Sequence, residues 1–255
     1  MKKGRYLYCI AEGSESINFG KIGIEGNSVY TFPYKDLSAV VHDCPAELYQ
    51  SANEEILKGW VSTHQKVLDI AWERFGTVLP FGFDTIIMGD GLTSPEENMK
   101  NCLKQDYDSF KRKIKKIGNK AEYGIQILWD SEVMAQKLAE ESIEIKKLSE
   151  EIKSKPRGLA YMYRQKLEGI LKKEMEAKAD RYFKEFYDKI KPYVDDLRVE
   201  KTKKTEDKDK QMFMNLSCLL SKAGSRELGD ELEKIDALEG FSVRYTGPWP
   251  PYSFV

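Results

Sequence analysis

Short apolar runs and long helix-spaced stripes follow one another along the chain, which predicts a mixed α+β fold. The apolar runs are bounded by glycine, proline or charged residues, as strands are; they cover residues 5–11, 37–42, 77–83, 86–88, 122–129, 193–201, 211–220 and 241–245. The stripes repeat every three to four residues, as on one face of a helix; they cover residues 53–74, 94–118, 130–152, 161–190 and 225–238.

Capping and breaking residues mark several of the expected helix ends. Asn53 and Ser94 each precede a stripe, and Ser94 is followed by a proline, which favours the first turn of a helix. Gly76 ends the first stripe. Residues 155–158, Lys-Pro-Arg-Gly, break or kink the long charged stretch of the second half.

The order of these elements predicts two α+β domains and a separate tail. We expect an N-terminal domain over residues 1–122 and a C-terminal domain over residues 123–246, followed by an extended tail over residues 247–255. With residues 122–129 as its first strand, the second half reads β-α(α)-β-β-α-β, which is the ferredoxin-like order. The first half has similar content in a different, modified arrangement. Whether the strand at 122–129 belongs to the N-terminal or to the C-terminal domain stays open.

The tail combines stiffness with a large apolar load. It carries Pro248, Pro250 and Pro251, which cannot continue a helix, so we expect extended backbone. Trp249, Tyr252 and Phe254 give it more apolar surface than a fraying terminus usually has. A stiff aromatic segment loses little entropy on ordering, so it should dock on its own protein or on a partner.

The overall composition narrows the function classes. The chain has 41 basic and 42 acidic residues in 255, a net charge of −1, which gives no general electrostatic footprint for nucleic acid. The most apolar stretch, residues 77–88, is too short for a membrane span and contains Pro80 and Asp84. The apolar run behind the basic start is too short for a signal peptide. We therefore expect a cytoplasmic protein without a lipid-membrane partner.

Metal, cofactor and catalytic motifs are not apparent. The four cysteines are scattered and there are two histidines, so no metal site is expected. Gly20, Gly23 and Gly26 match neither a P-loop nor a dinucleotide fingerprint, and we expect a hairpin or flexible loop and no cofactor. His64 lies on the apolar face of a predicted helix and His42 ends a strand, so structural roles are favoured over catalysis. We expect no enzyme, and an enzyme would need a pocket containing His64 or convergent carboxylates.

One cluster of basic residues remains, at 111–116, in the last turns of a predicted helix. Cations are favoured there by the helix dipole, so a solvated helix end is the simpler interpretation. A ferredoxin-like sheet can also read RNA, but the aromatic signature of that class is missing around Pro80-Phe81-Gly82-Phe83. A nucleic-acid or regulatory-ligand binder of ferredoxin-like fold is the alternative to a binding or assembly protein.

Four segments resemble one known family in the expected order. The tail, Gly-Pro-Trp-Pro-Pro-Tyr-Ser-Phe over residues 247–254, resembles the C-terminal signature of the gas vesicle proteins GvpF and GvpL. Three further matches are His64 with residues 78–83, residues 123–130, and Gly158 with residues 161–164. The resemblance implies a minor gas vesicle component with two α+β domains and without catalytic or cofactor-binding residues. It does not separate GvpF from GvpL.

The resemblance also implies a role and partners. Family members take part in vesicle assembly and interact with the main shell protein, GvpA; other gas vesicle accessory proteins are further candidate partners. Because an apolar shell protein that polymerises through strand edges is prone to aggregate, a soluble partner could cover it before assembly. The candidate docking or interdomain residues are Phe81, Phe83, Trp249, Tyr252 and Phe254. The simpler interpretation is that the aromatic tail fastens the two domains together and that Phe81 and Phe83 are core residues.

Overall fold

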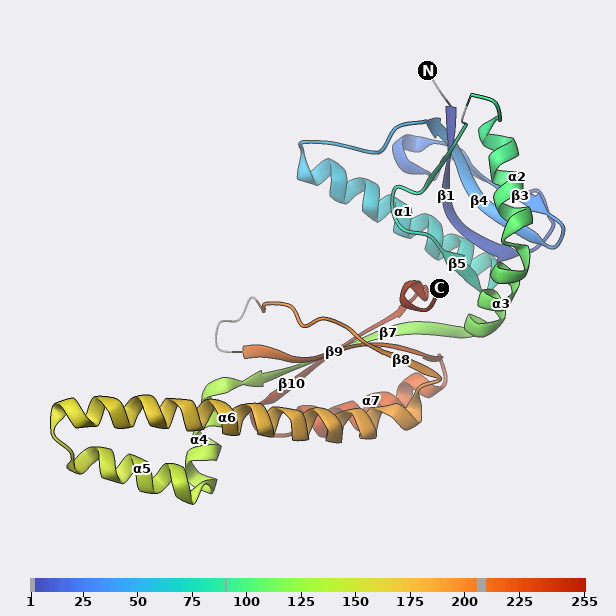
Figure 1. Ribbon diagram of the computed structural model, residues 1–255. Coiled ribbons are helices and arrows are strands. Elements are labelled where there is room, and N and C mark those ends of the chain that lie inside the picture. The colour runs from blue at the N-terminus through green and yellow to red at the C-terminus, as the bar shows by residue number, and fades with distance from the viewer. Residues whose placement is uncertain (1–2, 90, 206–209) are drawn as a thin grey trace. The chain divides into compact units, whose positions relative to one another are not determined.

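The computed structural model describes residues 3–89, 91–205 and 210–255 (Figure 1). The chain divides into two compact units. The first unit comprises Met1–Glu122 together with Pro248–Val255, and the second comprises Tyr123–Gly247. The last eight residues thus belong to the first unit, and the chain passes between the units after Glu122 and again after Gly247. That each unit folds as an independent domain stays a prediction.

An antiparallel sheet forms the centre of the first unit. Its strands run in the order β2-β3-β4-β1-β5, and β6 also pairs with β1; they are β1 (Lys3–Glu12), β2 (Asn18–Gly20), β3 (Val29–Tyr34), β4 (Leu37–Pro45), β5 (Val78–Pro80) and β6 (Ile86–Met88). β1 pairs with β4 along its whole length, with an irregularity between Leu7 and Cys9. From Tyr6 to Ala11 every residue of β1 is fully buried, so this strand is the core of the unit.

Helix α1 (Glu54–Phe75) packs beside β1 and β5 (Figure 1). The Asn53 side chain accepts a hydrogen bond from the Glu55 N–H, and Gly76 ends the helix at a φ of 72°, where glycine avoids the strain a side chain would add. Both ends agree with the sequence prediction. The fully buried face starts at His64; before it, Trp60 is partly buried against the core and packs on Tyr49, while Glu54, Glu55 and Ile56 are exposed.

The helix expected over residues 94–118 is in fact two helices, and the prediction of a single one is wrong. α2 (Pro95–Gln105) and α3 (Tyr107–Ile117) meet at Asp106, whose φ of −98° and ψ of 10° leave the helical region. Both helices bury an apolar stripe, Met99 and Leu103 in α2 and mainly Phe110 and Ile114 in α3. Met99, Leu103, Phe110 and Ile114 follow at intervals of four and seven residues, so they would share one face of a straight helix as well, and the periodicity does not reveal the break.

The glycine-rich segment lies in a hairpin of β2 and β3, and the strand β3 was not predicted from the sequence. β2 pairs antiparallel with β3, and the short 3-10 turn η1 (Ile24–Gly26) lies between them. Ile24 is fully buried. The strand β3 was missed because Pro33 interrupts its apolar run; in the structure Pro33 lies opposite Ser38 of β4.

The second unit contains a sheet of the order β10-β7-β9-β8. Its strands are β7 (Lys120–Asp130), β8 (Asp196–Val199), β9 (Lys210–Ser221) and β10 (Phe241–Trp249), and its helices are α4 (Ser131–Glu141), α5 (Ile143–Ser154), α6 (Arg157–Ile190) and α7 (Gly224–Asp236), with the 3-10 turn η2 at Lys191–Tyr193. β7 alternates strictly, with every second residue from Ala121 to Trp129 buried. An aromatic cluster joins α6 to the sheet, with Phe186, Phe213 and Phe241 within about 6.1 Å of one another.

The charged stretch expected as one helix before the Pro156 break is also two helices. α4 ends at Glu141, and Ser142, with extended backbone, caps α5 by accepting the Ile145 N–H. The break lets both short helices lie against α6, where Lys178 Nζ pairs with Glu141 Oε2 at 2.7 Å. The expected interruption at residues 155–158 is confirmed, because α5 ends at Ser154 and α6 begins at Arg157.

The C-terminal tail is only partly extended, which corrects the expectation for residues 247–255. β10 continues to Trp249, and the chain then closes into the 3-10 turn η3 (Tyr252–Phe254). The Tyr252 and Phe254 N–H groups donate to the Pro250 and Pro251 carbonyls at 2.8 and 3.2 Å. The prolines stop helix and sheet but preset this turn. Among the described helices, none combines the length and apolarity needed to cross a bilayer.

Candidate functional site

The C-terminal segment, Pro248–Val255, is seated on the first unit by its side chains. Phe254 is 3% exposed and Pro250 and Pro251 are buried. Ser253 binds the Glu122 carboxylate twice: its N–H donates to Oε2 at 2.8 Å and its hydroxyl donates to Oε1 at 2.6 Å. Charge-assisted hydrogen bonds of this kind are stronger than neutral ones. The segment is thus anchored to its own chain.

Tyr252 connects this segment to a buried polar cluster, the histidine–tyrosine network. The Tyr252 hydroxyl lies 3.3 Å from His64 Nε2, and His64 Nδ1 lies 2.8 Å from the Tyr6 hydroxyl. A second chain of contacts is built alike: Tyr8 Oη lies 2.8 Å from His42 Nδ1, and His42 Nε2 lies 3.0 Å from Tyr49 Oη. Both histidines of the chain are therefore in this cluster.

The surrounding donors fit one tautomer of each ring. The Tyr6 hydroxyl accepts the Asp84 N–H at 2.9 Å, so its own proton is free to go to His64 Nδ1. His64 is then neutral with its proton on Nε2, from which it donates to Tyr252. The Tyr8 hydroxyl likewise accepts the Ile24 N–H at 3.3 Å and donates to His42. Each ring accepts on one side and donates on the other.

Burial keeps these rings uncharged. His42 is fully buried and His64 is 3% exposed. Burial lowers the pKa of each to about 4, against the smaller opposing effects of the Asp43 charge on His42 and of the Phe81 carbonyl on His64. Burial also raises the pKa values of Tyr6, Tyr8 and Tyr252. Two neutral imidazoles out of reach of solvent are suited to holding strands, helix and tail together.

An apolar hollow opens where the C-terminal segment meets β5 and α3. Its volume is about 290 Å³, and we call it the aromatic hollow; its lining residues are Leu79, Pro80, Phe81, Gly82, Phe110, Lys113, Tyr252 and Val255. Phe81 and Phe110 meet edge to face with their centroids 6.3 Å apart. Lys113 is exposed on α3 and adds one positive charge to the lining. Such a hollow fits an apolar side chain of a partner, with a carboxylate beside it.

The structure brings some of the predicted site residues together and separates others. Phe81 and Tyr252 share the aromatic hollow. Phe83 instead packs on the network, within 6.3 Å of the rings of Tyr6, Tyr49 and His64. Phe254 is buried, with the Lys116 ammonium 5.8 Å from its ring. Trp249 is 48% exposed.

The sequence analysis missed the partners of these residues. Tyr6 and Tyr8 alternate along β1 as members of one face, which was an available signal. No local signal linked Glu122 or Phe110 to the tail, because both lie in distant parts of the sequence, and Val255 lines the hollow as the last residue of the tail itself.

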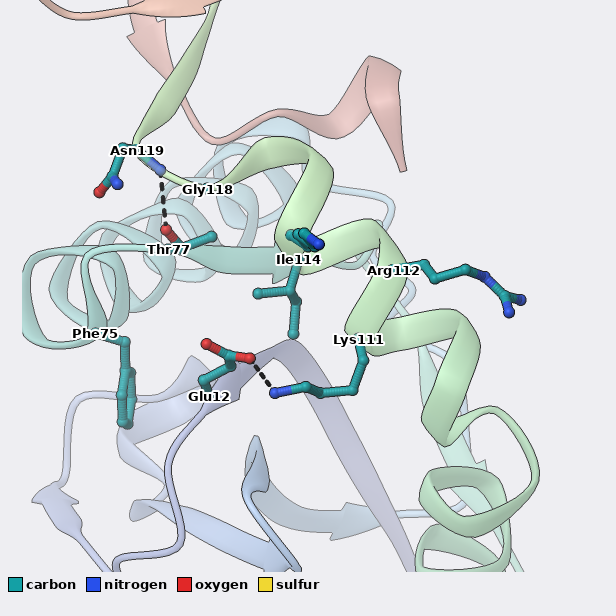
Figure 2. A pocket seen from close by; sticks show the side chains of 9 residues that line it. Glu12, Phe75, Thr77, Lys111, Arg112, Ile114, Gly118 and Asn119 are labelled. Carbon is teal, nitrogen blue, oxygen red and sulfur yellow. Dashed lines mark hydrogen bonds and ion pairs between the residues drawn. The ribbon is translucent and has the colours of Figure 1, made fainter.

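A second, polar hollow of about 520 Å³ lies beside the basic helix end (Figure 2). Lys111 pairs with Glu12 and, at 2.9 Å, with Asp36. Figure 2 shows Phe75 and Ile114 on its walls, while the Arg112 side chain extends away from the Glu12–Lys111 pair. Two carboxylates at Lys111 oppose the binding of a further anion, so this hollow is a poor site for phosphate. In the described part of the chain no group of histidine, cysteine and acidic side chains is placed to hold a metal ion.

The comparisons with known proteins cover nearly the whole chain. Residues 4–255 match the family described as gas vesicle synthesis protein GvpL/GvpF. Gas vesicle protein L1 of Halobacterium salinarum is 30% identical over 261 residues, covering 100% of this chain and 91% of that protein. Gas vesicle protein F of a Nostoc species is 22% identical, covering 100% of this chain and 98% of that protein.

Two solved structures share the fold. Gas vesicle protein GvpF from Anabaena sp. PCC7120 has a TM-score of 0.77 at 19% identity, covering 99% of this chain and 98% of that one. GvpF from Microcystis aeruginosa has a TM-score of 0.67 at 20% identity, with 98% of each chain covered. They confirm a mixed α and β fold with antiparallel sheets. The family match over residues 4–255 shows that this chain belongs to the GvpL/GvpF family of gas vesicle synthesis proteins.

Proposed function

We propose that this protein assists gas vesicle assembly by binding the apolar shell protein GvpA and limiting its aggregation before it enters the shell. Membership of the GvpL/GvpF family is the observation that carries the proposal. The relatives are named as gas vesicle proteins L and F. The same membership supports a location at the gas vesicle and contacts with its other accessory proteins. We propose no catalytic step.

The aromatic hollow is the docking site that we propose. Its walls include Phe81, which is half-buried, and Phe110, which is 6% exposed, and aromatic walls give large contact area at little conformational cost. Lys113 can pair with a carboxylate of the partner. Trp249, 48% exposed on the same segment, adds further apolar surface. An apolar subunit would find here the contacts that otherwise drive it to self-associate.

The C-terminal segment then has two roles, carried by different side chains. Tyr252 and Phe254 face the first unit and hold the segment in place, through His64 and through burial. Trp249 and the open side of the hollow face the partner. The sequence left open whether the tail anchors the protein's own domains or contacts a partner, and this division gives it both an anchoring and a partner-binding role. The anchoring contacts described here lie within the first unit.

Charge reversal on α3 tests the site without disturbing the core. Lys113 and Lys115 are both exposed and lie on the same helix, but only Lys113 lines the hollow. We expect Lys113→Glu to weaken binding to tagged GvpA in co-purification about tenfold, because one favourable ion pair is lost and one repulsive pair is gained. The matched control, Lys115→Glu, should bind as the natural protein does. Equal weakening by both variants would move the docking site elsewhere, and absence of binding by the natural protein would end the proposal.

We further propose that the second unit is a ferredoxin-like domain. Two observations support this. Its elements follow the order β-α(αα)-β-β-α-β, and its sheet order β10-β7-β9-β8 places the fourth strand beside the first and the second at the other edge. The first unit has a different strand order, β2-β3-β4-β1-β5.

A further inference from the structure

The turn between α5 and α6 combines positive charge with uncovered apolar side chains. Residues 152–167, which we call the basic turn, contain five lysine and arginine residues and no acidic residue. Leu159, Tyr161 and Met162 are 49%, 62% and 65% exposed. Figure 1 shows this turn at the end of α6 that is remote from the strands of its own unit. Large apolar side chains at such exposure, framed by charge, are typical of contact surfaces.

Helical spacing places the two arginines and Tyr161 on one side of α6, and Leu159 and Met162 on the opposite side. Arg157, Tyr161 and Arg164 follow at intervals of four and three residues, so they lie above one another on one face. The neighbouring contacts do not cover them: Lys155 lies over the Tyr163 ring at 5.4 Å, and the Tyr161 hydroxyl accepts only from Gln165 one turn away. The face thus presents an aromatic ring between two guanidinium groups.

The start of α1 has the opposite character. Residues 44–57, which we call the acidic start, contain Glu47, Glu54 and Glu55 and no basic residue. Leu48 and Ile56 are 52% and 45% exposed. Glu54 pairs with Lys58 at 3.8 Å, but both side chains are largely exposed and such pairs are weak. Ile56, which is 45% exposed, thus extends the apolar side chains of α1 towards its N-terminus, beyond Trp60, which packs on the core of the unit.

We propose that the basic turn of one copy of this protein docks on the acidic start of a second copy. The two surfaces are complementary in charge, and each offers exposed aliphatic or aromatic side chains for the other to cover. An anionic polymer or lipid could satisfy the charge of the basic turn, but the chain itself carries an acidic surface with matching apolar residues. Because the two surfaces differ, the contact is head-to-tail. In an open array, one basic turn stays uncovered at one end and one acidic start at the other.

Sedimentation velocity of the full chain over a wide range of concentration tests this. We expect reversible association that weakens with added salt, because exposed charges are screened. Arg157→Glu with Arg164→Glu should weaken association about tenfold, and so should Glu54→Lys with Glu55→Lys. A matched control, Lys172→Glu with Lys173→Glu, makes the same change of charge on exposed positions of α6 and should leave association unchanged.

Mixing the two reversed variants gives the sharper result. The acidified turn of one variant meets the basic α1 start of the other, so association in the mixture should be stronger than either variant shows alone. A variant that fails to fold cannot show this rescue, which separates loss of contact from loss of structure. A natural chain that stays monomeric at all concentrations would overturn the proposal, as would association that both double variants leave intact. Association that appears only with added RNA or anionic vesicles would also overturn it, because the partner would then not be a second copy.

Discussion

Acidification should destabilise this protein through its two buried histidines. Both rings are neutral and buried in the histidine–tyrosine network, and the pKa of each is lowered to about 4. In the unfolded chain both recover the ordinary value of about 6.5. Between these values the unfolded chain binds more protons than the folded one, so stability falls as pH falls from about 6.5 towards 4, and it is fully present above that window.

The magnitude follows from the width of the window. Each pH unit within it costs about 1.4 kcal/mol per histidine, so a change from neutral pH to about pH 5 removes roughly 2 kcal/mol for each and roughly 4 kcal/mol for both. Added protons also break the network itself, because a protonated Nδ1 of His64 can no longer accept from Tyr6. Asp36, whose pKa is lowered to about 2 mainly by Tyr107, then Lys111, responds only at lower pH.

Urea unfolding followed by circular dichroism at neutral pH and at about pH 5 measures this effect. The control is His42→Gln with His64→Gln, because an amide keeps a donor and an acceptor but does not titrate here. The double variant should be less stable at neutral pH but nearly indifferent to this change of pH, and each single variant should keep about half of the effect. Equal free energies of unfolding at both pH values in the natural protein would refute the reasoning, as would an unchanged pH dependence in the double variant.

Three further predictions concern the docked C-terminal segment and the buried lysine of α6. Phe254→Ala should lower the free energy of unfolding by about 3 kcal/mol, the cost of emptying a buried phenylalanine site, and a loss below about 1 kcal/mol in urea unfolding would contradict the docked segment. Ser253→Ala should cost about 1 to 2 kcal/mol, and much less when Glu122 is already glutamine; additive losses in this double-mutant cycle would show that the two do not interact. Lys178→Met should be nearly neutral in thermal unfolding, since it replaces a buried ammonium by a similar apolar volume, whereas Glu141→Gln should destabilise; the reverse order would contradict the pairing.

The local elements of the fold were largely predictable from the sequence because their signals are local. Asn53 and Gly76 bound α1, and Pro156 separates α5 from α6, as expected from capping and proline chemistry. The breaks at Asp106 and Ser142 were not predicted, since neither a glycine nor a proline marks them. The buried residues keep the same helical face across both breaks, so their periodicity does not reveal that the helix is interrupted.

The candidate site was predictable only in part. The aromatic content of the C-terminal segment indicated that it docks, and Tyr252 and Phe254 do pack against the first unit. Its attachment points, His64 and Glu122, lie 188 residues from Tyr252 and 131 residues from Ser253 along the chain. His64 was expected to be a structural core residue; burial keeps it neutral, and its partners Tyr6 and Tyr252 come from the two ends of the chain, which the sequence did not indicate.

The central claim is that this protein keeps the shell protein from aggregating through the aromatic hollow. Light scattering of GvpA diluted out of denaturant, with this protein added in equimolar amount, tests that claim most directly. We expect scattering to be suppressed by the natural protein and by Lys115→Glu, and to rise again with Lys113→Glu. Scattering that is the same with and without the natural protein would contradict the claim.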